Sequence, residues 1–491
     1  MDNSTIALMI IFIVVGLSSL LGFYSGARHK MDLEQWTVAG RGFGIILVWL
    51  LMAGEIYSTF AFLGASGWSY SRGGPTLYIM AYMALAYVIS FYILPQIWEI
   101  GNKFSMQTQS DFFEKRYNSK KLAVFISLIG VIFIIPYLQL QLVGLGIIVE
   151  IASFGGISRT AAMLIAFILV AAFVFVSGIR AVAWVSVVKD ILMLLVALFI
   201  GIGLPYTYFG GLEGMFNALL SVHPEHLTMP GSTVNMGHSW YISTVVLTAL
   251  GFYMWPHLFS ATFTAKSSDT LRHNAIIMPL YSISLPLIFF VGFTAIMVIP
   301  GLVNGDLALL TLVQKTYPAW FLGLVGAAGA LTAMVPAAIL ILAAATLFAK
   351  NVWRPVFSPN MDDVAVGKLA KIMVIVITAI ALYFAIYSSS TLVSLLLLGY
   401  AGVTQFFPGV IFGLYWKRVT TKGVFCGIVT GIVTLSYLVL NKMDPYLGIN
   451  AGCIALLLNF FVTIVISLLT PCINNGFILI EEEVDIDESD K

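Results

Sequence analysis

The chain has 491 residues, of which 60% are hydrophobic and only 10% are charged, and its mean hydropathy is +0.99. A water-soluble domain could not cover its surface with so few charged side chains, so lipid must be the main solvent of this chain. A net charge of +1 gives no sign of nucleic-acid binding, and the three cysteines lack the spacing of a disulfide framework or a metal site. We therefore expect a multi-pass cell-membrane protein, in contact with membrane lipid, that binds no nucleic acid.

Thirteen apolar segments are each long enough to cross a bilayer core of about 30 Å. They predict an all-α membrane protein with 13 transmembrane helices, and the first is expected to be an uncleaved span because no basic region precedes it. The predicted spans are 5–24, 43–69, 75–97, 122–149, 160–179, 182–208, 239–263, 276–300, 319–348, 369–387, 390–414, 424–440 and 449–469.

The basic residues are distributed unevenly between the two sets of loops. Nineteen of the 24 Lys and Arg residues fall in one set of alternate loops, and four fall in the other. Cytoplasmic loops of membrane proteins carry the excess of Lys and Arg, so the N-terminus is predicted outside and the C-terminus in the cytoplasm. The segment 470–491, which ends in an acidic run, is then expected to form a solvated cytoplasmic tail.

Glu55 is an acidic residue inside the second predicted span. A carboxylate at membrane depth costs several kcal/mol unless it is protonated, paired or facing water. Small and hydroxylated residues surround Glu55, as they do where a spanning helix breaks to line a cavity. The chain is therefore interpreted as a secondary transporter, with Glu55 at its transport site.

A second irregularity lies in the seventh predicted span, where Pro256 follows Trp255. Proline removes a backbone donor and clashes with the preceding turn, so the helix must kink or open there. The second and seventh spans cross in opposite directions, five spans apart, as in two inverted five-helix repeats. We expect repeats at about 43–208 (spans 2–6) and 239–414 (spans 7–11) within a single transporter domain, 1–469. The alternative is a proline that merely bends a packed helix.

Four segments resemble motifs of the sodium:solute symporter family, in the correct order along nearly the whole chain. Residues 35–44 resemble the start of the second span, 108–117 the cytoplasmic loop after the third, 250–257 the broken span of the sodium/proline branch, and 416–431 the signature joining spans 11 and 12. The resemblance, closest to the proline and monocarboxylate branches, implies the leucine-transporter fold with its inverted repeat. It also implies a transporter rather than an enzyme, with a small solute and a monovalent cation as partners, no cofactor, and no required oligomer.

The same resemblance implies a sodium site that is incomplete in this chain. Its backbone carbonyls would belong to Ala53, Ile56 and Thr332, and two hydroxyl side chains would stand where this sequence has Val335 and Pro336. Neither Val335 nor Pro336 can supply a side-chain oxygen, the ligand that hard cations require. The coupling ion is therefore expected to be Na+ or H+, without a decision between them.

Two residues are candidates for coupling ion movement to transport. Lys189 lies one turn beyond Ser186, where many relatives carry an aspartate, and its ammonium could reach the vacated cation position. Alternatively, Lys189 extends to the cytoplasmic interface and pairs with Asp190. For Glu55 three roles remain open: a direct cation ligand, a proton carrier, or a buried structural acceptor.

The predicted substrate-binding residues surround the two breaks: Glu55, Tyr57, Phe60, Tyr253, Trp255 and His257. This set is aromatic and poor in hydrogen-bonding groups, which favours a small, compact substrate over a sugar. The free amides of a broken helix suit a carboxylate, such as a monocarboxylate or an amino acid. The alternative for each aromatic residue is ordinary packing or lipid contact.

These patterns predict cation-coupled symport of a small organic solute by alternating access. The alternatives are proton rather than sodium coupling, or a membrane sensor or channel built on the same helices. A channel would need a polar stripe along a pore, and a sensor would usually carry a signalling domain. An enzyme would need a cluster of catalytic side chains, and the sequence shows no such motif.

Overall fold

The computed structural model describes residues 2–26, 33–176, 178–233, 235–387 and 389–471, and the regular structure of these residues is helical. Within these residues, ten helices are long and apolar enough to cross a membrane, and two bent helix pairs raise the number to at most twelve. The all-α class is thus confirmed, whereas the count of thirteen is not. The predicted span 160–179 corresponds to α8 (Arg159–Val176), which is one of the shorter apolar helices. The predicted tail lies almost entirely outside the described residues, and the orientation of the termini stays a prediction.

The α-helices are α1 (Asn3–Gly26), α2 (Leu33–Val38), α3 (Ile45–Ile56), α4 (Ala65–Ser71), α5 (Tyr78–Lys103), α6 (Gln109–Tyr117), α7 (Lys120–Ala152), α8 (Arg159–Val176), α9 (Ile179–Phe209), α10 (Leu212–Val222), α11 (His238–Gly251), α12 (Pro256–Thr262), α13 (Ser268–Ser282), α14 (Ser284–Val298), α15 (Ala308–Thr316), α16 (Ala319–Thr346), α17 (Arg354–Phe357), α18 (Asp363–Tyr387), α19 (Leu392–Val403), α20 (Phe407–Tyr415), α21 (Thr421–Leu440) and α22 (Ala451–Leu469). Short helical turns that matter below are η2 (Phe60–Gly64), η5 (Phe252–Met254) and η7 (Leu347–Trp353).

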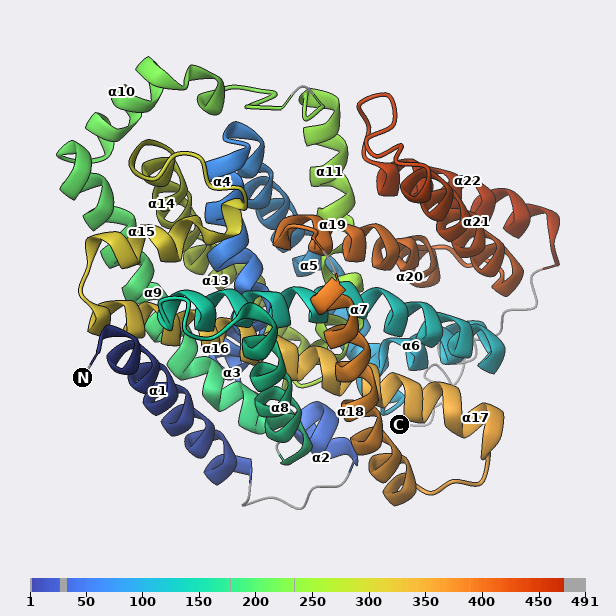
Figure 1. Ribbon diagram of the computed structural model, residues 1–491. Coiled ribbons are helices and arrows are strands. Elements are labelled where there is room, and N and C mark those ends of the chain that lie inside the picture. The colour runs from blue at the N-terminus through green and yellow to red at the C-terminus, as the bar shows by residue number, and fades with distance from the viewer. Residues whose placement is uncertain (1, 27–32, 177, 234, 388, 472–491) are drawn as a thin grey trace.

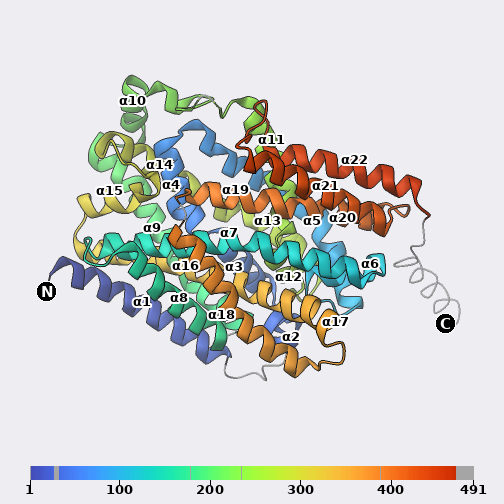
Figure 2. The same ribbon diagram turned by 45° about the vertical axis from the view of Figure 1, so that its right-hand side comes forward.

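Helix α16 forms the centre of the bundle. It is rich in Ala and Gly, nearly all of its residues are buried, and it packs against α1, α7 and α9. Small side chains let neighbouring helices approach closely, which explains how one helix can be surrounded on all sides. Figures 1 and 2 show α21 and α22 side by side at the edge of the bundle, where α22 contacts α11 and α19.

Both predicted helix breaks are present. Between α3 and the η2–α4 segment the axis bends by 57°, and Tyr57 has a non-helical backbone (φ −88°, ψ 77°). Between α11–η5 and α12 the axis bends by 54°, at Trp255 (ψ 127°) directly before Pro256. Proline suits the first position of a new helix, where a backbone N–H would have no partner in any case. The assignment of two inverted repeats stays a prediction.

Asp111, on α6, joins that helix to η7. Its carboxylate accepts hydrogen bonds from Lys350 (2.7 Å), Asn351 (2.9 Å) and the backbone N–H groups of Gln107 (2.8 Å) and Thr108 (3.0 Å). Burial raises the pKa of Asp111, but Lys350 and the hydrogen bonds outweigh burial and hold this pKa below its ordinary value of 3.8. The segment containing α6 is therefore attached to the end of α16 by a buried charge network.

We expect Asp111→Asn to lower the free energy of unfolding by about 2 kcal/mol, because it leaves Lys350 without its ion-pair partner. The lowered pKa means that the contribution of Asp111 is present above about pH 4 and lost as the pH falls further. Thermal unfolding of the purified protein measures both effects. The control is Asp363→Asn, since Asp363 pairs with Arg354 but is 70% exposed. Equal unfolding midpoints for the two variants would contradict this prediction.

Candidate functional site

Glu55 and His257 bring the two helix breaks together. The Glu55 carboxyl at the end of α3 is buried, and its Oε2 lies 3.6 Å from Nε2 of His257 on α12. Among the described residues, none donates a hydrogen bond to either carboxyl oxygen or bonds to either nitrogen of His257. The backbone carbonyl of Glu55 accepts a hydrogen bond from the Tyr137 hydroxyl (3.0 Å), which fixes α7 against the break. Two titratable side chains thus face each other with unused hydrogen-bonding capacity.

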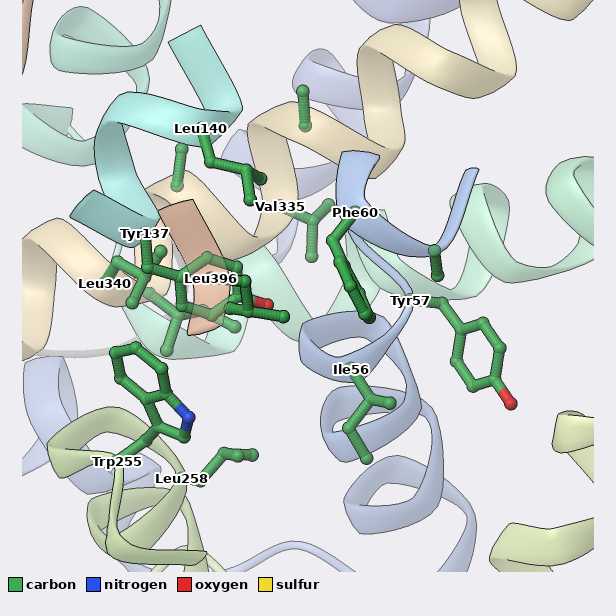
Figure 3. Close-up of a cluster of buried hydrophobic side chains, with 14 of the residues drawn as sticks. Ile56, Tyr57, Phe60, Tyr137, Leu140, Trp255, Leu258, Val335, Leu340 and Leu396 are labelled. Carbon is green, nitrogen blue, oxygen red and sulfur yellow. The ribbon is translucent and has the colours of Figure 1, made fainter. Parts of the chain in front are cut away.

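A small cavity of about 10 Å³, the space that about one water requires, lies beside the Glu55 carboxyl. In Figure 3, Trp255, Tyr137, Leu258 and Leu396 gather on one side, opposite Ile56 and Phe60. The indole of Trp255 contacts the rings of Tyr137 and Tyr400, at centroid distances of 5.0 and 5.3 Å. The full lining is Glu55, Ile56, Phe60, Tyr82, Tyr137, Phe252, Trp255, Leu258, Leu396 and Tyr400. The cavity is therefore aromatic, with one carboxyl group, the hydroxyls of three tyrosines and the indole N–H of Trp255 as its polar side-chain groups.

His257 also borders a second cavity, on the side of the Thr108 end of α6. This cavity is lined by Thr37, Gln107, Thr108, Ile179, His257, Ser260, Ile339, Leu342, Ala343 and Thr346. The imidazole thus lies between the Glu55 carboxyl and a hydroxyl-rich space outside the central cavity. A histidine can accept a proton on one nitrogen and donate one from the other, so this arrangement can pass protons.

The structure brings together only part of the predicted substrate-binding set. Phe60 and Trp255 line the cavity with Glu55, and His257 contacts Glu55 from α12. Tyr57 points away from Trp255 (Figure 3) and packs its ring edge-on against Tyr281, with centroids 4.2 Å apart. Tyr253 packs against Phe252 and is not part of the lining.

The sequence interpretation missed Tyr82, Tyr137 and Tyr400, which line the cavity from α5, α7 and α19. Tyr82 and Tyr400 lie in apolar spans without a neighbouring proline or charge, and the one local signal was Pro136, directly before Tyr137 in α7. Two buried glutamines are engaged elsewhere: Gln141 accepts a hydrogen bond from the Thr59 hydroxyl (2.7 Å), and Gln405 accepts one from the Asn459 amide on α22 (3.1 Å).

The assignment of the Ala53, Ile56 and Thr332 carbonyls as sodium ligands stays a prediction. The carbonyl of Ala53 accepts a hydrogen bond from the Tyr57 N–H (2.9 Å), and that of Ile56 accepts one from the Ser58 N–H (3.1 Å). Val335 and Pro336 are buried in α16, and their side chains have no oxygen that could bind a cation.

Lys189 is fully buried and pairs with Asp190, so the pairing expected in the second alternative is present and the extension to the membrane interface is not. Its ammonium donates to the carbonyls of Gly54 (3.0 Å) and Tyr57 (3.2 Å) and pairs with Asp190 (2.6 Å). Glycine is required at position 54 for this approach, since a Cβ atom there would lie 2.7 Å from Oγ of Ser186 on α9. A cationic side chain of α9 therefore lies at the break that carries Glu55.

Residues 36–431 match the sequence model of the Sodium:solute symporter family. The chain belongs to this family. This family and fold are those of transporters, not of enzymes, and the many apolar helices indicate an integral membrane protein.

Relatives and solved structures agree with this membership. The chain is 47% identical over 477 residues to the Uncharacterized symporter YhjB of Bacillus subtilis (strain 168), covering 94% of this chain and 97% of YhjB. It is 27% identical over 489 residues to the Monocarboxylate transport permease protein of Rhizobium johnstonii (strain DSM 114642 / LMG 32736 / 3841), covering 96% and 98%. A substrate-bound, outward-open structure of a Na+-coupled sialic acid symporter superimposes with a TM-score of 0.80 at 17% identity, covering 95% and 98%. That last likeness shows that the fold is shared.

Proposed function

We propose that this protein is a proton-coupled symporter of a small organic carboxylate, with Glu55 as the group that carries the proton. The observation that carries the proposal is the Glu55 carboxyl itself, which is buried at one helix break and lies 3.6 Å from His257 at the other. A bare carboxylate at this depth is costly, whereas a carboxyl group that binds and releases a proton is tolerated. Glu55 also lies where the two breaks meet, and this is where transporters with broken helices have their substrate sites.

The geometry supplies a physical reason for coupling one proton to one anion. The cavity holds about one water in this structure, so a carboxylate substrate needs the surrounding helices to move apart, and it would then lie close to the Glu55 carboxyl in the lining. Two carboxylates in a buried site repel each other strongly and are most stable when they share one proton. Binding of the anion therefore favours protonation of Glu55, and the two are released together.

The cavity supports a small substrate. Its lining is mostly aromatic and aliphatic, with few groups that could pair with the hydroxyls of a sugar. The 27% identity with the Monocarboxylate transport permease protein along nearly the full length of both chains points to the same class. A short monocarboxylate is the substrate class that we propose.

Sodium coupling fits the described residues less well. The two side chains expected to complete a sodium site, Val335 and Pro336, carry no oxygen. The carbonyls of Ala53 and Ile56 already accept backbone hydrogen bonds. Since hard cations require several oxygen ligands, losing two of them weakens such a site severely.

Uptake of radiolabelled acetate or pyruvate into proteoliposomes tests the proposal. We expect uptake at constant pH to be unchanged when choline replaces sodium, and to be accelerated by acid outside the vesicles. With one proton per anion, an inward gradient of one pH unit should support about tenfold accumulation, because about 1.4 kcal/mol corresponds to a factor of ten.

Two results would contradict this function. Strict sodium dependence at constant pH would show that sodium is the coupling ion. Flux that only equilibrates the substrate under every gradient would favour a channel over a symporter.

A further inference from the structure

Lys189 satisfies the hydrogen-bonding capacity of its ammonium completely within the protein. An ammonium group has three N–H donors, and this one has three acceptors: the carbonyls of Gly54 and Tyr57 and the carboxylate of Asp190. The Tyr281 hydroxyl donates to the same Asp190 oxygen (3.0 Å), which extends the network to α13. Because the side chain is fully buried, these contacts replace all of its water.

The two carbonyls are available because the helix opens between them. In a continuous helix the Gly54 carbonyl would accept from the Ser58 N–H, but this N–H bonds to the Ile56 carbonyl instead. Tyr57 has a non-helical ψ of 77°. Carbonyls released by a broken helix at membrane depth need a cation or a donor, and in transporters they commonly coordinate the coupling ion.

We infer that the Lys189 ammonium is a tethered cation that binds the Gly54 and Tyr57 carbonyls in the broken α3–α4 span, next to the Ala53 and Ile56 carbonyls expected to hold sodium, and takes the place of a bound metal cation there. The inference rests on the proposed function and explains why that function can dispense with sodium. The helix α16 presents a hydrocarbon side chain to the break, since Cγ1 of Val335 lies 3.5 Å from the position that a Cβ atom on Gly54 would take. A sodium ion at the same carbonyls would meet the positive charge of Lys189 without the oxygen ligands needed to offset it.

The position of the charge also links α9 to Glu55. The ionisable groups that act on Lys189 are Asp190 on its own helix and Glu55 at the break, and the Tyr281 hydroxyl on α13 bonds to Asp190. Asp190 balances the ammonium permanently, while Glu55 attracts it only when Glu55 is ionised.

The test compares thermal unfolding of the purified protein in sodium chloride and in choline chloride, at one pH and one ionic strength. We expect the midpoint of the wild type to be the same in both salts. In the variant that combines Lys189→Ala with Val335→Ser and Pro336→Ser, the two carbonyls lose the ammonium, and hydroxyls stand at the two positions where the family resemblance implies sodium ligands. We expect sodium to raise the midpoint of this variant by about 2 °C or more, in a saturable manner.

A second variant keeps the inference testable if the combined variant does not fold. Lys189→Met preserves much of the side-chain volume but leaves Asp190 and two carbonyls unpaired, so we expect a lower midpoint and loss of proton-driven uptake. Lys189→Arg keeps the charge and should retain more of both. The matched control is Lys315→Met, because Lys315 donates only to the Val298 carbonyl at an exposed site.

Three outcomes would overturn the inference. The first is a saturable rise of the wild-type unfolding midpoint with sodium, and the second is a combined variant that folds but has the same midpoint in both salts. The third is a Lys189→Met variant with wild-type stability and uptake. The thermal assay needs no substrate, so it separates this inference from the proposed function. If the wild type has the same unfolding midpoint in both salts but does not accumulate carboxylates, the result contradicts the proposed function alone.

Discussion

Glu55→Gln should abolish the accumulation of substrate against its gradient while the protein still folds and inserts. The substitution preserves side-chain volume in a tightly packed cavity but removes the negative charge and the exchangeable carboxyl proton. With an inward gradient of one pH unit, the ratio of internal to external substrate should fall from about ten to about one. Glu55→Asp retains the carboxyl group on a shorter side chain, so we expect it to keep part of the activity. Proteoliposome uptake measures the ratio directly.

The control for Glu55 is a carboxyl group outside the site. Glu213, at the start of α10, is exposed, so Glu213→Gln should accumulate substrate as the wild type does. Exchange of labelled for unlabelled substrate needs no net proton movement and separates binding from coupling. Full concentrative uptake by Glu55→Gln would reduce Glu55 to a structural acceptor.

The sequence predicted the two breaks because their causes are local. Pro256 cannot continue a helix, and the stretch around Glu55 combines an acidic residue with small and hydroxylated ones; the bends of 54° and 57° lie at these positions. The meeting of Glu55 with His257 could not be derived from composition or spacing, since it depends on how two spans about 200 residues apart cross. The cavity tyrosines on α5, α7 and α19 were missed for the same reason.

Lys189 shows a different limit of sequence reasoning. Its distance along the chain from the inner end of its span permitted either an interfacial or a buried position. The buried position of Lys189 depends on Gly54, which lets α9 approach the break, and on the carbonyl acceptors that the break creates. Both are consequences of tertiary packing, so the ion pair with Asp190 was predictable but the two carbonyl contacts were not.

His257→Phe should slow net proton-driven uptake by about tenfold or more while leaving substrate exchange largely intact. The imidazole lies between the Glu55 carboxyl and the second cavity, and phenylalanine fills similar space without a nitrogen that could carry a proton. Exchange can proceed with Glu55 protonated throughout, whereas net uptake requires Glu55 to release its proton in every cycle. The matched control is His273→Phe, because His273 is exposed on α13. If His257→Phe and His273→Phe show equal net uptake, the proton does not leave through His257, and its contact with Glu55 serves packing only.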